Sequence, residues 1–183
     1  MGAEPDSDAG TSAMTLSEEE RRMVTLWAVA CAGRALPLFE ARAPSDTRPR
    51  DAIGAAREFG LGGKRTGQLR SLAWAAQAAA REVGDPVAAA AARAAACAAA
   101  APYMHALANL HQAKHALGPA MYQAQAHELA AGDDPGVGDA EIRWAIEQAS
   151  PAVREVVRRF PVRGAGRTRQ STFLHQLDAG LRR

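Results

Sequence analysis

Three of the five histidines lie close together between two tyrosines, at positions 105, 111 and 115. His111 and His115 are four residues apart, so on a helix both imidazoles project from one face, and Tyr122 falls on the same stripe. An imidazole titrates near pH 6.5 and suits general acid–base chemistry. If the protein is an enzyme, the sequence therefore predicts that His111, His115 and Tyr122 act on an acidic small molecule. The alternative is that both histidines make ordinary hydrogen bonds at a buried interface.

A metal site is the other chemistry that this spacing suggests, because two imidazoles one turn apart can share an ion. Such a site needs further ligands from another helix. The sequence contains neither an HExxH motif nor a paired-cysteine motif. We therefore predict no metal and no cofactor.

A second group of charged residues begins the next expected helix, where Asp46, Arg48 and Arg50 follow Glu40. The two guanidiniums could hold a carboxylate or phosphate in two-point fashion. Alternatively they pair with Glu40 or Asp46 and fix the loop. The start of a helix favours anions, so unpaired arginines gain nothing there, and we favour the pairing.

Three more residues are candidates for contact with a ligand or partner. Trp27 and Cys31 lie one turn apart in an apolar stretch, and His105 points about 120° away from His111 on an ideal helix. The simpler interpretation of Trp27, and equally of Trp74, is a core side chain. Burial among alanines likewise favours an inert thiol for Cys31 over a nucleophile.

The elements that position these residues are helices. The chain of 183 residues is rich in alanine, the best helix former, and only 5% aromatic, and no stretch has the alternation of a strand. We predict an all-α, single-domain, alanine-rich bundle of about six to eight helices. We expect a mobile N-terminal tail over 1–16, the bundle over 17–160, and a basic tail over 161–183 that could form a short docking helix.

The boundaries of the expected helices follow from caps and prolines. Ser17-x-x-Glu20 is a capping box that starts a helix reaching about residue 41, kinked or shortened at Pro37. Further helices are expected over 49–60 and 66–83. From 86 to 131 we expect one long helical region, bent or broken at Pro102 and at Pro119.

Charge and composition limit the partners. A net charge of +2 is too small to indicate nucleic-acid binding, and the arginines of the tail are too few to change that prediction. The N-terminus lacks the apolar segment of a signal peptide, and we predict a cytoplasmic protein with reduced thiols and no membrane contact. The sequence is compatible with a homodimer as well as with a monomer.

Two segments resemble a family of putative immunity proteins, some of which are catalogued as an exonuclease subunit. The first is LWAVACAGRALPLFE over 26–40, followed by Asp46, Arg48-Pro49-Arg50 and Ala52-Ile53. The second is the histidine segment His105-x5-His111-x3-His115-Ala-Leu-Gly, followed by Tyr122. The resemblance implies an all-helical bacterial, cytosolic protein that binds and neutralises a toxin.

The chain departs from that family at four places. Members commonly carry acidic residues near Ala30 and Gly33 and a histidine near Gln77, and their helix usually continues where this chain has Pro119. If those acidic residues belong to a shared site, this protein has lost or rebuilt it.

Two functional hypotheses remain. The favoured one is a binding protein that occludes a partner, such as a toxin, without chemistry. The alternative is a small-molecule site, catalytic or sequestering, between the histidine helix and the first two helices, such as a biosynthetic pathway would use.

Overall fold

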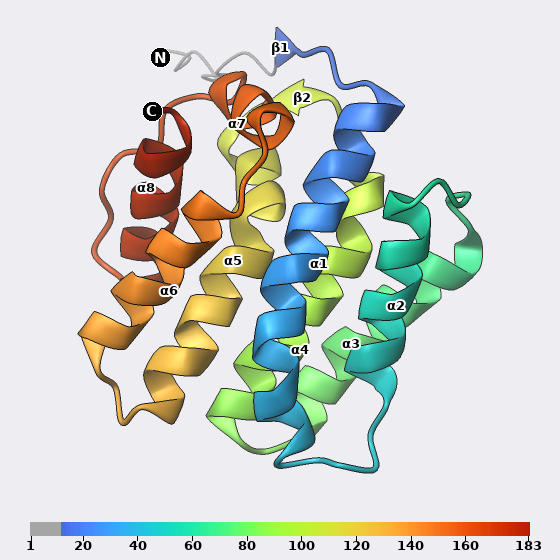
Figure 1. Ribbon diagram of the computed structural model, residues 1–183, viewed down its shortest axis with the longest axis vertical. Helices are drawn as coiled ribbons and strands as arrows, with labels where there is room; N and C mark the ends of the chain where they lie inside the picture. The colour runs from blue at the N-terminus through green and yellow to red at the C-terminus, as the bar shows by residue number, and fades with distance from the viewer. Residues whose placement is uncertain (1–11) are drawn as a thin grey trace, which may run out of the picture.

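The computed structural model describes residues 12–183 and is an all-α bundle, as predicted (Figure 1). Residues 1–11, most of the tail expected to be mobile, lie outside the described part. The described chain forms the following helices: α1 (Glu18–Glu40), α2 (Arg48–Gly60), α3 (Gly67–Glu82), α4 (Pro86–Ala100), the 3₁₀ turn η1 (Ala101–Tyr103), α5 (Leu110–Ala130), α6 (Pro135–Glu147), α7 (Pro151–Arg158) and α8 (Arg169–Leu181).

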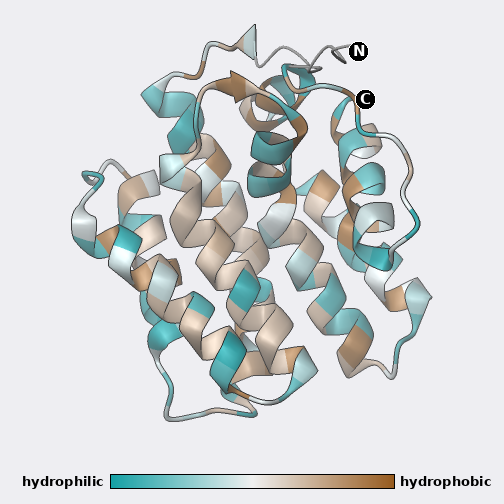
Figure 2. Cartoon of the chain, turned by 180° about the vertical axis from the view of Figure 1, so that it is seen from behind, coloured by the Kyte–Doolittle hydropathy of each residue, from teal (hydrophilic) through white to brown (hydrophobic). Residues whose placement is uncertain are grey.

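The alanine-rich helix α4 lies at the centre of the bundle and packs against α1, α2, α3 and α5. Eleven of its 15 residues are buried. Seen from behind, α4 crosses the middle of the molecule with the pale colour of its alanines (Figure 2). Small side chains let neighbouring backbones approach closely: a Cβ added at Gly118 of α5 would lie only 3.2 Å from Cys97 Sγ of α4. Alanine composition therefore sets the helix spacing.

Helix α1 runs along the front of α4 and begins at the predicted capping box of Ser17 and Glu20. Pro37 neither ends nor shortens it, contrary to our expectation. Proline removes only its own amide bond, and the Ala41 amide still donates to the Pro37 carbonyl at 3.0 Å. By length and composition α1 could cross a membrane, but its buried face packs on α2, α4 and α5 as a core helix does.

The C-terminal helices complete the bundle: α6 and α8 pack against α5, and α7 packs against α1 and α8. The predicted docking helix is present as α8, whose Phe173, Leu174, Leu177 and Leu181 are buried in the same core cluster as residues of α1 and α5. The bundle therefore continues past residue 160.

The histidine segment is not one helix from Tyr103 onward, which corrects our prediction. Pro102 closes α4 in the short turn η1, and α5 begins only at Leu110, where the Asn109 side chain accepts a hydrogen bond from the Gln112 amide at 2.8 Å. His105 therefore lies in a loop. Pro119, expected as a bend or break, lies inside the continuous α5, because the loss of one backbone bond is outweighed by burial of this turn against α4.

The first described residues pair with the loop before α5. Ser12–Ala13 (β1) pairs antiparallel with Leu107–Ala108 (β2), although the sequence indicated no strand. Met14 and Leu16 then pack on the core. Residues 12–16, which we assigned to the tail, are thus part of the folded body.

A first prediction tests the alanine packing. Replacing the fully buried Ala98 with leucine should lower the free energy of unfolding by about 1–3 kcal/mol, because the added atoms have no space between α4 and its neighbours. Ala130→Leu, at an exposed position on α5, is the matched control and should change it by less than about 0.5 kcal/mol. Denaturant unfolding measures both. Equal effects of the two substitutions would contradict close packing around α4.

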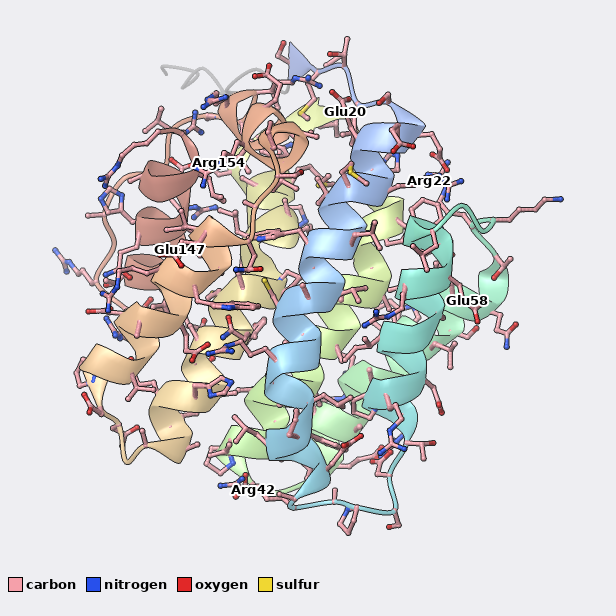
Figure 3. The ribbon with its side chains drawn as sticks, viewed as in Figure 1. Glu20, Arg22, Arg42, Glu58, Glu147 and Arg154 are labelled. Carbon is pink, nitrogen blue, oxygen red and sulfur yellow. The ribbon has the colours of Figure 1, made fainter. Side chains whose placement is uncertain are left out.

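A second prediction concerns acid stability. Glu20 of α1, labelled in Figure 3, accepts a hydrogen bond from Arg159, just after α7, at 2.6 Å. This contact lowers the pKa of Glu20 from 4.5 to about 2. A depressed pKa stabilises the fold above pH 4.5, and that stabilisation is lost as the pH falls towards 2. Glu20→Gln should therefore flatten the decline of the melting temperature between pH 5 and 2. The exposed Glu147→Gln is the control, and it should leave the wild-type slope unchanged.

Candidate functional site

The arginines that follow the first loop are paired internally, as we favoured. Arg48 contacts Asp46 at 2.7 Å and Glu82 at 2.8 Å, and Arg50 contacts Glu40 at 2.6 Å. The hydrogen bonds from Arg48 lower the pKa of Asp46 below its ordinary value. Glu40, Asp46, Arg48 and Arg50 were predicted as binding residues. Instead they fix the α1–α2 connection, paired with one another and, through Arg48, with Glu82 of α3.

The paired arginines Arg48 and Arg50 lie at the opposite end of the bundle from the histidines. Glu40 is the last residue of α1, whereas Arg21, in its first turn, donates to the carbonyl of Met104 next to His105. These two places are nineteen residues apart along α1, which corresponds to about 29 Å. In Figure 1 the α1–α2 connection is at the bottom and β2 is at the top. The structure therefore does not form the predicted small-molecule site between the histidine helix and the first two helices.

His111 and His115 are exposed side chains at the start of α5. Their Nε2 atoms are 3.0 Å apart and their rings meet edge to face. Partial burial, then the charge of His111, lowers the pKa of His115. Tyr122, two turns further along, packs half-buried against the core, and no hydrogen bond joins it to either histidine among the described residues. The proposed catalytic trio is not assembled.

Trp27 and Cys31 face inward and are closed to a partner. The Trp27 indole donates to the carbonyl of Ala145 in α6 at 2.9 Å. Cys31 is fully buried, and burial raises the pKa of its thiol far above the ordinary value. Both are core residues, which was the simpler of the two interpretations.

A groove with a volume of about 970 Å³ lies beside His105 and His115. It runs between α3 and the α4–η1 segment. Its lining is unusual in having four arginines and no carboxylate. The residues that matter for its chemistry are Arg21, Arg65, Arg70, Trp74, Gln77, Arg81, Cys97, Tyr103, His105 and His115.

One wall of the groove is a single stripe of α3. Arg70, Trp74, Gln77 and Arg81 follow one another at four, three and four residues, so they share one helix face. The opposite face of α3 buries Leu69 and several alanines, which fixes the orientation of the stripe. Trp74 is 66% exposed. This corrects our expectation of a core tryptophan and leaves a large aromatic surface open to solvent.

The mouth of the groove at η1 is held by hydrogen bonds to backbone carbonyls. Arg65 donates to Pro102 at 3.0 Å, Arg21 donates to Met104, and the Tyr103 hydroxyl donates to Thr66. The guanidinium of Arg70 lies 4.5 Å from the centre of the Tyr103 ring. These contacts tie the η1 loop to α1 and to the start of α3.

The groove is electropositive. Burial, and then the nearby charge of Arg65, lowers the pKa of Arg21, as expected where like charges are held together. The nearest carboxylate is Glu18, 3.3 Å from Arg65 and 3.8 Å from Arg21. Arg70 and Arg81 have no carboxylate partner among the described residues.

The floor of the groove contains Cys97. Burial raises the pKa of this thiol to about 11, and the charges of Lys114 and Arg93 offset the effect only in part. The thiol is therefore neutral near pH 7. The groove presents cations, an indole and a phenol, a combination suited to holding an anionic and apolar group.

Of the predicted site residues, His105 and His115 line this groove. Sequence reasoning missed its arginines and Trp74, and it also missed one network around the buried Glu141. The spacing of 70, 74, 77 and 81 was the available signal, but a tryptophan on an alanine-rich helix is usually a core residue. The exposed Arg34 pairs with the buried Glu141 at 2.9 Å and lies over the Trp144 ring at 4.5 Å, while the buried Gln123 amide donates to Glu141. This network joins α1, α5 and α6 and has a structural role.

A third prediction separates the two thiols. In the folded protein at pH 7.5, iodoacetamide should modify Cys97 much more slowly than a free cysteine of ordinary pKa, about 8.5, and the rate should rise as the pH approaches 11. Cys31, fully buried, should react only after unfolding. Mass spectrometry of the alkylated peptides gives both rates. Rapid labelling of Cys97 at neutral pH would contradict the raised pKa.

Comparison with known proteins adds one positive result. Neither the curated proteins nor the solved structures gave a significant match. The family model described as "Imm-5 like putative immunity protein" matches residues 14–152, which include α1 to α6 and the whole lining of the groove. The chain therefore belongs to the Imm-5 like putative immunity protein family.

Proposed function

We propose that this protein binds a toxin in the cytoplasm and neutralises it by occlusion, through the groove between α3 and α4. The observation that carries the proposal is Trp74, which is 66% exposed in the middle of an arginine-lined hollow. Membership of an immunity-protein family supports a protein as the partner.

The composition of the groove fits a protein interface. Tryptophan, tyrosine and arginine dominate the residues at which truncation weakens protein complexes most. Here Trp74, Arg70 and Arg81 share one helix, so their backbone spacing is already set before binding, and only their side chains remain to be ordered. A stable complex would bury more than roughly 1,000 Å² in total, so the groove would form the centre of a larger contact.

A second candidate is an acidic small molecule held in the same groove. A volume of about 970 Å³ favours it, being at the upper end of the range of roughly 300–1,000 Å³ for ligand pockets. The ligand would then meet Arg70, Arg81 and His115 in place of the predicted Arg48 and Arg50. The experiment below distinguishes the two candidates, because a small-molecule site gives no reason for protection against a toxin.

A fourth prediction tests the proposed function. The full-length protein is co-expressed with a candidate toxin, and survival of the host cells is measured. Trp74→Ala and Arg70→Gln should each weaken the complex by about 30-fold, equivalent to about 2 kcal/mol at a central interface residue, and should reduce protection.

Matched controls come from α2. Arg57→Gln makes the same change at an exposed arginine, and Leu61→Ala truncates an exposed apolar side chain just after that helix. Both should protect like the wild type. Full protection by the Trp74 and Arg70 variants, with unchanged binding, would refute the groove as the toxin-binding site.

A further inference from the structure

We infer that the groove recognises an acidic peptide segment of its partner: an extended stretch with two carboxylates about five residues apart and an apolar or aromatic side chain between them. This inference rests on the proposed function and specifies the chemistry of the partner at the same site.

The arginines available for binding are those of α3. Arg70 and Arg81 have no carboxylate within reach among the described residues, unlike Arg48, Arg50 and Arg169, each of which is paired. The guanidinium of Arg70 stacks on Tyr103, so its N–H edge can still bind a carboxylate in two-point fashion.

The arginines at the mouth have a different role. Arg21 and Arg65 share Glu18, and each donates to a backbone carbonyl of the η1 loop. They are engaged in holding the wall of the groove. The charge offered to a ligand is therefore concentrated at the two ends of the α3 stripe.

The spacing of that stripe sets the spacing of the ligand. Eleven residues separate Arg70 from Arg81, which corresponds to about 16 Å along a helix. An extended peptide advances about 3.3 Å per residue, so carboxylates some five residues apart match the two guanidiniums. Trp74 lies one turn from Arg70, between the two charges.

The surface between the charges is apolar and favours a peptide over a polyanion. Ala73, Ala96 and Ala100 line it beside the exposed indole. An apolar side chain inserted there would remove apolar area from water, worth roughly 25 cal/mol per Å². A nucleic acid carries a charge at every nucleotide, whereas the free guanidiniums occur only at the two ends.

The test uses the full-length protein and four fluorescent probes, followed by anisotropy. The first is a ten-residue peptide with two glutamates five residues apart and a phenylalanine between them. The second replaces both glutamates with glutamine, the third replaces the phenylalanine with serine, and the fourth is a ten-nucleotide oligothymidine. The expected result is that the first probe binds at least tenfold more tightly than the other three, and less tightly as salt is raised.

Protein variants locate the binding. Arg70→Gln, Arg81→Gln and Trp74→Ala should each weaken binding of the first probe at least fivefold, whereas Arg57→Gln should leave it unchanged. All four positions are exposed, and thermal melting confirms that each variant is folded.

Several results would overturn the inference: no binding of the first probe at 1 mM, equal binding of the glutamine peptide, tighter binding of oligothymidine, or equal loss with Arg57→Gln. Its failure is distinguishable from failure of the proposed function. If the peptide fails while groove variants still lose protection against the toxin, only the acidic-segment inference falls. If the peptide binds but the groove variants still protect against the toxin as the wild type does, the proposed function is wrong.

Discussion

Close packing of neighbouring helices around α4 is the constraint on which the rest of the structure depends. Its alanines contribute little apolar area each, so the bundle gains stability from many short-range contacts between backbones that approach closely. Because alanine side chains are all alike in shape, they do not by themselves fix the position of one helix relative to the next. Polar contacts fix these positions: Arg34 with Glu141 between α1 and α6, and Glu20 with Arg159 beside α7.

The same constraint produces the groove. Between α3 and α5, the outward face of α4 carries Ala96, Cys97 and Ala100, which are too small to fill the space up to the tops of the neighbouring side chains. Trp74, on the neighbouring wall, stays exposed. The feature that we interpret as a binding site is thus a direct consequence of alanine composition on one helix and an Arg-Trp-Gln-Arg stripe on the next.

Local signals in the sequence predicted much of the fold. The capping box at Ser17, the span of α3 and the apolar spacing of Phe173, Leu174 and Leu177 each determine structure through neighbours within a few residues. The candidate site depended on long-range placement, which such signals do not contain. The sequence around His105 is typical of a helix, but Pro102 closes one helix before it and Asn109 caps the next one after it. No local signal indicates that Arg48 lies a full length of α1 away from the histidines.

The central claim is that a partner protein covers the groove between α3 and α4. Hydrogen–deuterium exchange of the chain, alone and in complex with the toxin that it is proposed to bind, tests this most directly. The account predicts slower exchange in the complex at the less buried amides of α3 and in the η1 loop, residues 101–106, with α6 and α8 unchanged. Protection confined to α6–α8 or to the α1–α2 connection, with α3 and η1 unaltered, would contradict it.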